Sequence, residues 1–270
     1  MKSILIFAIA SIMVIFIGCG TSSNGNKSGD QTNATSIKDT SPKAPSTSAA
    51  ETMGAKAGEN LDIINVPDSV PGSKTIPCGM EGSELSDNTR SKDAHLAWLG
   101  NPLKNRYDIP KPGDIKTLKV GDLVASDAIK SKFTQGTAVE VTGYVYVVKS
   151  GGQESCNCKT TGQSFWDTHI ELTPDNKDTS VKSIFIVEVT PRLREELNKQ
   201  AEWTTETLHK NILHHTVTIQ GWLFYDEIHE PEAYSTNPNN TPINSKTHKG
   251  PNFRASCWEI HPITSINVVK

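Results

Sequence analysis

The feature that most constrains the fold is strict alternation of apolar and polar residues in the last apolar run of the chain. The run 257–262 reads CWEIHP, so an extended strand places Glu259 and His261 on one face and the large apolar residues on the other. The run 167–172 is built in the same way and places three polar side chains on one face: Asp167, His169 and Glu171. Two such strands predict a sheet or barrel with a polar site on its surface.

The chain begins with the parts of a secretory signal. Lys2 makes the start basic, residues 4–17 are almost wholly apolar, and the small residue Gly18 follows them. An apolar stretch of roughly 14 residues is short for a membrane span and is typical of a signal peptide. We therefore expect export.

The end of this segment, Phe16-Ile17-Gly18-Cys19, resembles the bacterial lipobox, with Phe16 where Leu is usual. The resemblance implies that residues 1–18 are a lipoprotein signal peptide and that Cys19 is lipidated. Lipid chains contribute about 0.8 kcal/mol per buried methylene, so several would anchor the protein to a membrane. We expect a lipoprotein of the bacterial cell envelope. In a diderm, Gly20 is compatible with outer-membrane sorting. The alternative is an ordinary signal or an uncleaved anchor.

Residues 19–72 are rich in Ser, Thr, Asn and Gly and contain few large apolar side chains. Such a segment buries too little surface to offset its ordering entropy, so we expect a disordered tether. Residues 73–270 then form one domain, which is long enough for a real core.

Charge argues against a nucleic-acid partner. The chain has 27 Lys and Arg, of which Lys2 lies in the signal, so 26 basic residues stand against 30 acidic ones and the net charge is −4. A nucleic-acid-binding domain usually shows a basic balance or stripe. The expected partners are the membrane, through the lipid anchor, and an unknown ligand or protein.

Four cysteines remain in the domain: Cys78, Cys156, Cys158 and Cys257. An even number in an exported chain favours disulfides. Cys156 and Cys158 are too close in sequence to pair with each other without strain, so each would reach for one of the other two. Free thiols and a thiolate metal site are the alternatives, and the sequence leaves the pairing open.

Strand patterns occupy 138–148, 167–172, 181–189, 216–225 and 257–269. The first has Val145 and Val147 on one face and an interior Gly143, which often marks a bulge or a barrel corner. The fold class that these segments predict is mainly β with short helices (α+β). It is an OB-like five-stranded barrel with a helical insertion after the third strand.

The expected helices are short. One spans 91–99 and ends at Gly100, and another follows Ser126 as a cap. The insertion contains a helix that begins at Pro191 and a second one over 203–212. Residues 154–158 are expected to return as an extended segment after a turn.

The stretch from Cys78 to Val269 resembles a family of uncharacterised bacterial exported proteins. The motifs that carry the resemblance include ESCNC at 154–158, DTHI at 167–170, VEVTPR at 187–192 and WEIHP at 258–262. The resemblance implies an OB-like fold and no named substrate.

The candidate catalytic residues are His169, Glu188, Glu259 and His261. Two imidazoles and a carboxylate hold catalytic zinc in many enzymes, so His169, His261 and Glu259 are the candidate metal ligands and a divalent ion such as zinc is the candidate cofactor. Without metal, a His beside a carboxylate is a general-base pair. The same cluster also suits a buried hydrogen-bond network that has no chemistry.

The candidate binding residues are Tyr144, Tyr146, Trp222, Asp226 and His229, since outward aromatic rings form stacking platforms. The sequence contains no G-x-S-x-G, P-loop or dinucleotide motif. Three hypotheses remain open: an OB-like module that binds an oligosaccharide, nucleic acid or protein; a metal-assisted hydrolase of the phosphodiester type; and a structural envelope protein.

Overall fold

The computed structural model describes residues 76–83, 91–239 and 251–270. The predicted signal peptide, Cys19 and the tether at 19–72 lie outside the described residues. Within the described ranges, no helix has the length and apolar character needed to cross a membrane.

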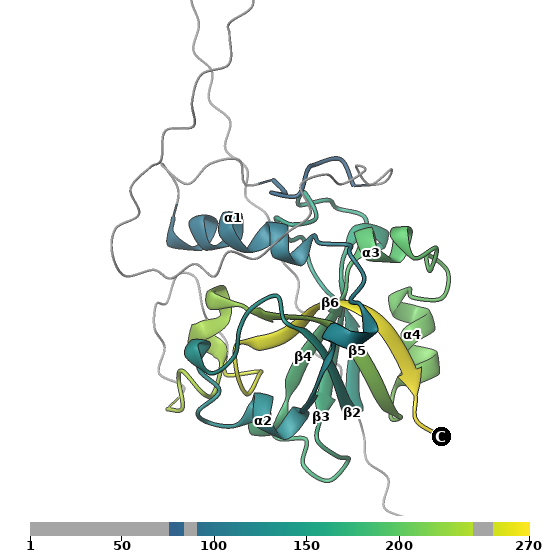
Figure 1. The fold of residues 1–270 in the computed structure, drawn as a ribbon. Helices are drawn as coiled ribbons and strands as arrows, with labels where there is room; N and C mark the ends of the chain where they lie inside the picture. Colours follow the sequence, from purple (N-terminus) through teal and green to yellow (C-terminus); the bar gives the residue numbers. More distant parts are fainter. Residues whose placement is uncertain (1–75, 84–90, 240–250) are drawn as a thin grey trace, which may run out of the picture. The chain divides into compact units, whose positions relative to one another are not determined.

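Five strands close into a barrel: β2 (Ala138–Ser150), β3 (Thr168–Thr173), β4 (Phe185–Val189), β5 (Thr216–Tyr225) and β6 (Trp258–Val268). Their hydrogen-bonded order is β2-β3-β4-β6-β5, and β5 pairs back onto β2 (Figure 1). Every pair is antiparallel except β4–β6, which joins the third and fifth barrel strands in parallel. This arrangement is an OB-like barrel, so the predicted fold class is confirmed.

Short elements surround the barrel. The strand β1 (Lys116–Lys119) pairs in parallel with β2. The α-helices among the described residues are α1 (Lys92–Lys104), α2 (Val120–Val124), α3 (Pro191–Glu196) and α4 (Thr205–Ile212). Short 3-10 helices occupy 112–114, 130–132, 163–165, 181–183 and 227–232. The helices α3 and α4 form the predicted insertion, and the hydroxyl of Thr204 caps α4 by accepting from the backbone N–H of Thr207 at 3.1 Å.

Alternation sorts the side chains of the barrel strands into two layers. Ile170, Leu172 and Ile260 are fully buried in the barrel interior. Their polar neighbours on the same strands, such as His169 and Glu259, take the opposite face. These polar side chains are buried as well, so a second layer of chain covers the outside of the barrel here.

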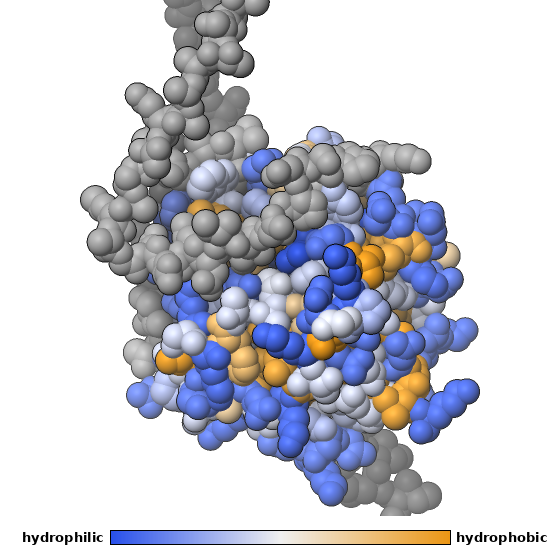
Figure 2. Space-filling view, in the orientation of Figure 1, coloured by the Kyte–Doolittle hydropathy of each residue, from blue (hydrophilic) through white to orange (hydrophobic). Residues whose placement is uncertain are grey.

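That second layer consists of the segment 76–83, the helix α1 and the loops that precede β3 and β6. The amide of Asn105, just past α1, donates to the carbonyls of Met80 at 2.7 Å and Cys156 at 3.0 Å, and its oxygen accepts from Arg192 of α3. In Figure 1, α1 lies across the barrel on the same side as α3. On the face drawn in Figure 2, hydrophobic residues form separate groups among hydrophilic ones.

Two local predictions failed near the helices. The helix α1 was expected to end at Gly100 but continues through Pro102 to Lys104. Tertiary contacts hold this last turn, because Gly100 packs against the ring of Phe224 and the amide of Asn101 donates to a backbone carbonyl. The helix expected after Ser126 lies instead before it, as α2, because burial of Leu123 in the core decides its position.

Two further predictions failed in and after β2. The bulge between Val145 and Val147 reverses the alternation, so that Val148 is buried and Val147 is not. Residues 154–158 form successive turns in place of an extended return, with the Cys158 N–H donating to the Ser155 carbonyl at 3.0 Å. A run this short has no periodicity to separate a strand from a turn.

Gly221 on β5 permits the close approach of β6. A Cβ atom at this position would lie 2.4 Å from both the side chain of Ile260 and the carbonyl of Pro262. We therefore expect Gly221→Ala to destabilise the domain by about 1–3 kcal/mol or more, as overpacking does. The matched control is Gly121→Ala in α2, where nothing lies within 4 Å and the change should be neutral or mildly stabilising. Urea unfolding measures both, and equal stability of the two variants would contradict this account.

Candidate functional site

The structure brings all four candidate catalytic residues together on the outer face of β3, β4 and β6. His169 and Glu188 are register partners, and Nδ1 of His169 lies 2.8 Å from Oε1 of Glu188. The other oxygen of Glu188 lies 3.3 Å from Nδ1 of His261, which also contacts Oε1 of Glu259 at 3.1 Å. The parallel pairing of β4 with β6 makes this contact, because it sets Val187 beside Ile260 and so aligns Glu188 with His261.

Arg254 extends this chain of contacts from the loop before β6. Its Nη2 lies 2.5 Å from Oε2 of Glu259, and both side chains are 2% exposed. Sequence reasoning missed Arg254, since it falls in a loop without periodicity. A charge in a loop is more often solvated than buried.

Lys104, at the end of α1, joins the two loops that flank the site. Its ammonium lies 3.2 Å from Glu154 and 3.3 Å from Asp226. The same oxygen of Asp226 lies 2.9 Å from Nδ1 of His229, so two of the predicted binding residues belong to this region. Burial lowers the pKa of Lys104, but the carboxylates around it outweigh that effect and the pKa is raised.

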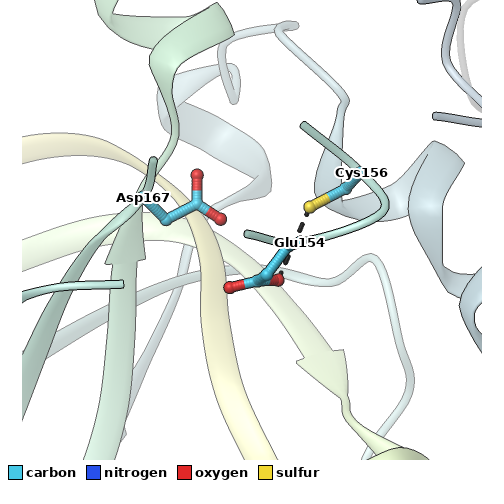
Figure 3. Close-up of side chains that lie close together, drawn as sticks. All are labelled: Glu154, Cys156 and Asp167. Atoms are coloured by element: carbon cyan, nitrogen blue, oxygen red, sulfur yellow. Dashed lines mark hydrogen bonds between the residues drawn. The ribbon is translucent and has the colours of Figure 1, made fainter. Parts of the chain in front are cut away.

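Asp167 completes the site between the loop before β3 and the strand β6. Its Oδ1 accepts from the amide of Asn157 at 3.0 Å, and its Oδ2 lies 3.6 Å from Nε2 of His261. Burial, followed by repulsion from Glu154, raises the pKa of Asp167 to about 7. The thiol of Cys156 donates to Glu154 at 3.5 Å, and these two groups face Asp167 across a common space (Figure 3).

We use the term charged cluster for ten residues: Lys104, Glu154, Asp167, His169, Glu188, Asp226, His229, Arg254, Glu259 and His261. Burial lowers the pKa of His261, but the hydrogen bond with Glu259 and nearby carboxylates raise it to about 9 overall. Burial raises the pKa of Glu188, but His169 and His261 lower it well below its usual range. Buried charges persist only when they are paired in this way.

Two pockets open onto the charged cluster. One, the polar pocket, has a volume of about 260 Å³ and is lined mostly by charged and polar residues, which include Lys149, His169, Glu188 and Arg254. The other has a volume of about 510 Å³ and runs between α1 and the end of β5, where its lining includes Phe224. Four residues line both pockets, so the two adjoin: Lys104, Glu154, Asp226 and His229.

The aromatic binding candidates line neither of these pockets, and Trp222 lies far from Tyr144. Tyr144 pairs with Thr216 on β5, and its hydroxyl lies 3.1 Å from Nδ1 of His214. Trp222 pairs with Ala138, six residues or roughly 20 Å away along β2. Its indole donates to the Asp108 carbonyl and its ring lies under the guanidinium of Arg106 at 3.5 Å. Tyr146 is half-buried on β2. These rings therefore form no single stacking platform.

The structure settles the pairing of the cysteines. Cys78 and Cys158 form a disulfide across 80 residues, which ties the segment 76–83 onto the loop before β3. Cys156 and Cys257, which were grouped with them as disulfide candidates, are buried free thiols. Cys257 belongs to the barrel core, where burial raises its pKa to about 11.

The residues that the structure groups as possible metal ligands differ from the three predicted from the sequence. Among the described residues, two groups place one ligating atom each within 4.8 Å of the others: Asp167 with Glu188 and His261, and Glu154 with Cys156 and Asp167. Of the predicted ligands, only His261 belongs to such a group. Nδ1 of His169 is engaged by Glu188, and the carboxylate of Glu259 is held by His261 and Arg254.

No protein-family model, curated protein or solved structure matches this chain. The site therefore has to be interpreted from its own geometry.

The buried ion pair of Arg254 with Glu259 gives a stability prediction. Arg254→Met leaves Glu259 buried without its cation, and we expect a loss of about 3–5 kcal/mol in the free energy of unfolding. Adding Glu259→Gln should recover part of this loss, because the uncompensated charge is then gone. Lys199→Met is the control, since it breaks a pair with Glu202 at 2.5 Å that is exposed and worth at most about 1 kcal/mol. Equal losses in Arg254→Met and Lys199→Met would refute the role of burial.

Proposed function

We propose that this protein is a lipid-anchored lipoprotein of a bacterial envelope that carries an OB-like binding module. The lipobox-like Phe16–Cys19 segment supports the anchor, and the tether-like composition of 19–72 supports a module held clear of the membrane. The resemblance of the domain to exported bacterial proteins agrees with this location.

The observation that carries the proposal is the position of the charged cluster. OB folds bind their ligands on the face of the second and third barrel strands, between the loop after the first strand and the loop after the fourth. In this barrel those strands are β3 and β4, and those loops are 151–167 and 226–257. His169 and Glu188 lie on that face, and Glu154 and Asp226 come from those loops.

The ligand class that suits this site best is a short oligosaccharide. The larger pocket, of about 510 Å³, is of small-ligand size, and the adjoining one of about 260 Å³ extends it. The smaller one offers cations and carboxylates to hydroxyl groups, whereas the larger one adds the apolar surfaces of Phe133 and Phe224 for the face of a sugar ring. The lining of mixed sign and the formal net charge of −3 disfavour nucleic acid.

A metal-assisted hydrolase, of phosphodiesters for example, is the second candidate. The observation in its favour is the pair of ligating groups that share Asp167. A hydrolase requires an ion with an open position for water. Turnover of a model phosphodiester by the metal-loaded protein, lost in His261→Ala with the fold retained, would favour it over the binding module.

The binding proposal is tested by a substitution in the wall of the larger pocket. Ile228 is half-buried in its wall, so Ile228→Glu places a charge against the apolar part of the site. We expect calorimetric titration with envelope-derived oligosaccharides to show at least a tenfold loss of affinity, which is about 1.4 kcal/mol. The control is Ile109→Glu, at a side chain that is 50% exposed and outside both pockets.

Saturable binding by the wild type and by Ile109→Glu, with loss in Ile228→Glu, supports the proposal. Binding of single-stranded nucleic acid in place of glycans would overturn the ligand class. Absence of binding to every oligosaccharide would overturn the module and favour a structural envelope protein.

A further inference from the structure

We propose that Asp167, Glu188 and His261 bind one divalent transition-metal ion, with Cys156 as a further ligand, at the base of the polar pocket. This inference goes beyond the binding function and does not depend on it. The three residues come from the end of the loop before β3, from β4 and from β6, so the barrel holds them on rigid strands or directly beside one.

The spacing of the three side chains suits a single ion. One ligating atom from each lies within 4.8 Å of the other two. Oδ2 of Asp167 and Nε2 of His261 are 3.6 Å apart. Two ligands of a tetrahedral zinc ion, each about 2.1 Å from the metal, are separated by about 3.4 Å. A small movement of side chains therefore converts this contact into coordination.

Each of the three residues keeps one atom without a hydrogen bond. These atoms are Oδ2 of Asp167, Oε2 of Glu188 and Nε2 of His261. The residues are 0%, 7% and 1% exposed, so water does not reach these atoms freely. Their contacts with one another are ion pairs only: Oδ2 of Asp167 lies 3.6 Å from Nε2 of His261, and Oε2 of Glu188 lies 3.3 Å from Nδ1 of the same ring. Buried polar atoms normally have hydrogen bonds, so three ligating atoms that lack them in one place are consistent with a shared partner.

The remaining atoms of the same side chains are held by neighbours, as the outer contacts of metal sites are. Asn157 donates to Oδ1 of Asp167, and His169 engages Oε1 of Glu188. Nδ1 of His261 engages Glu259, whose other oxygen is fixed by Arg254. A metal-bound histidine commonly donates its second N–H to a carboxylate in this way, which orients the ring. Glu259, which the sequence predicted to be a ligand, thus orients the ligand His261 instead.

Cys156 lies beside this group and shares Asp167 with it, so it reaches the ion after a movement toward Glu188 and His261. It forms the second ligating group with Glu154 and Asp167, and the three side chains converge in Figure 3. Sulfur, imidazole and carboxylate donors together select zinc and related ions over magnesium or calcium. Glu154 and Glu188 also line the pocket of about 260 Å³, so that pocket gives the ion access to solvent and ligand.

The competing arrangement has a proton in place of the ion. A protonated Asp167 that donates to Nε2 of His261 would satisfy both atoms. Metal content distinguishes the two arrangements directly, whatever the ligand of the protein is.

The experiment uses the full-length protein, purified without chelator. We expect elemental analysis to find about one zinc or similar ion per chain. Removal of the ion with EDTA should lower the melting temperature, and addition of Zn²⁺ or Co²⁺ should restore it. The Co²⁺ form should show a thiolate charge-transfer band that Cys156→Ser removes while Co²⁺ stays bound.

His261→Ala and Asp167→Asn should lose the ion, whereas the control His229→Ala should keep it. His229 makes an equivalent imidazole–carboxylate pair with Asp226 but belongs to neither ligating group. Should the ligand variants fail to fold, the wild type alone decides. No metal as purified, and no change in melting temperature on adding Zn²⁺, Co²⁺ or Mn²⁺, would overturn the site. Retention of stoichiometric metal by folded His261→Ala would overturn it as well.

Discussion

The pairing of buried charge across β3, β4 and β6 is the interaction on which the rest of the site depends. A carboxylate such as Glu259, 2% exposed, persists only with a cation in contact, and Arg254 supplies it from a loop. That loop is therefore held in place by electrostatics as much as by packing. His261 contacts Glu188 and Glu188 contacts His169, so these ion pairs connect β6, β4 and β3 into one network.

The barrel accommodates this network because each strand places its apolar side chains on one face and its polar side chains on the other. Ile170 and Ile260 fill an apolar interior. The residue adjacent to each, His169 or His261, belongs to the polar layer. The polar layer needs its own cover, which α1 and the segment joined by Cys78–Cys158 provide.

Local periodicity accounts for what the sequence could predict. The strand β5 was predicted at its observed bounds, 216–225, and the alternation at 257–262 placed Glu259 and His261 on one face. What it missed depends on long-range contacts: Arg254 and Lys104 carry no pattern, and α1 continues past Gly100 where Phe224 and the amide of Asn101 make tertiary contacts. The sequence pattern places Asp167 on the polar face of its strand. Its proximity to His261 follows from barrel closure, which no local pattern encodes.

Charge balance explains why a ligand-free network, a binding pocket and a metal site can share one set of residues. The charged cluster contains five carboxyl groups, three imidazoles, one Lys and one Arg, so it is neutral when every imidazole is protonated and every carboxyl is ionised. At the proposed metal site, a divalent ion would replace the proton of His261 and the proton of Cys156, a thiol beside the cluster. The formal charge of the cluster and this thiol together would then be unchanged, so the charge balance that permits burial would be kept.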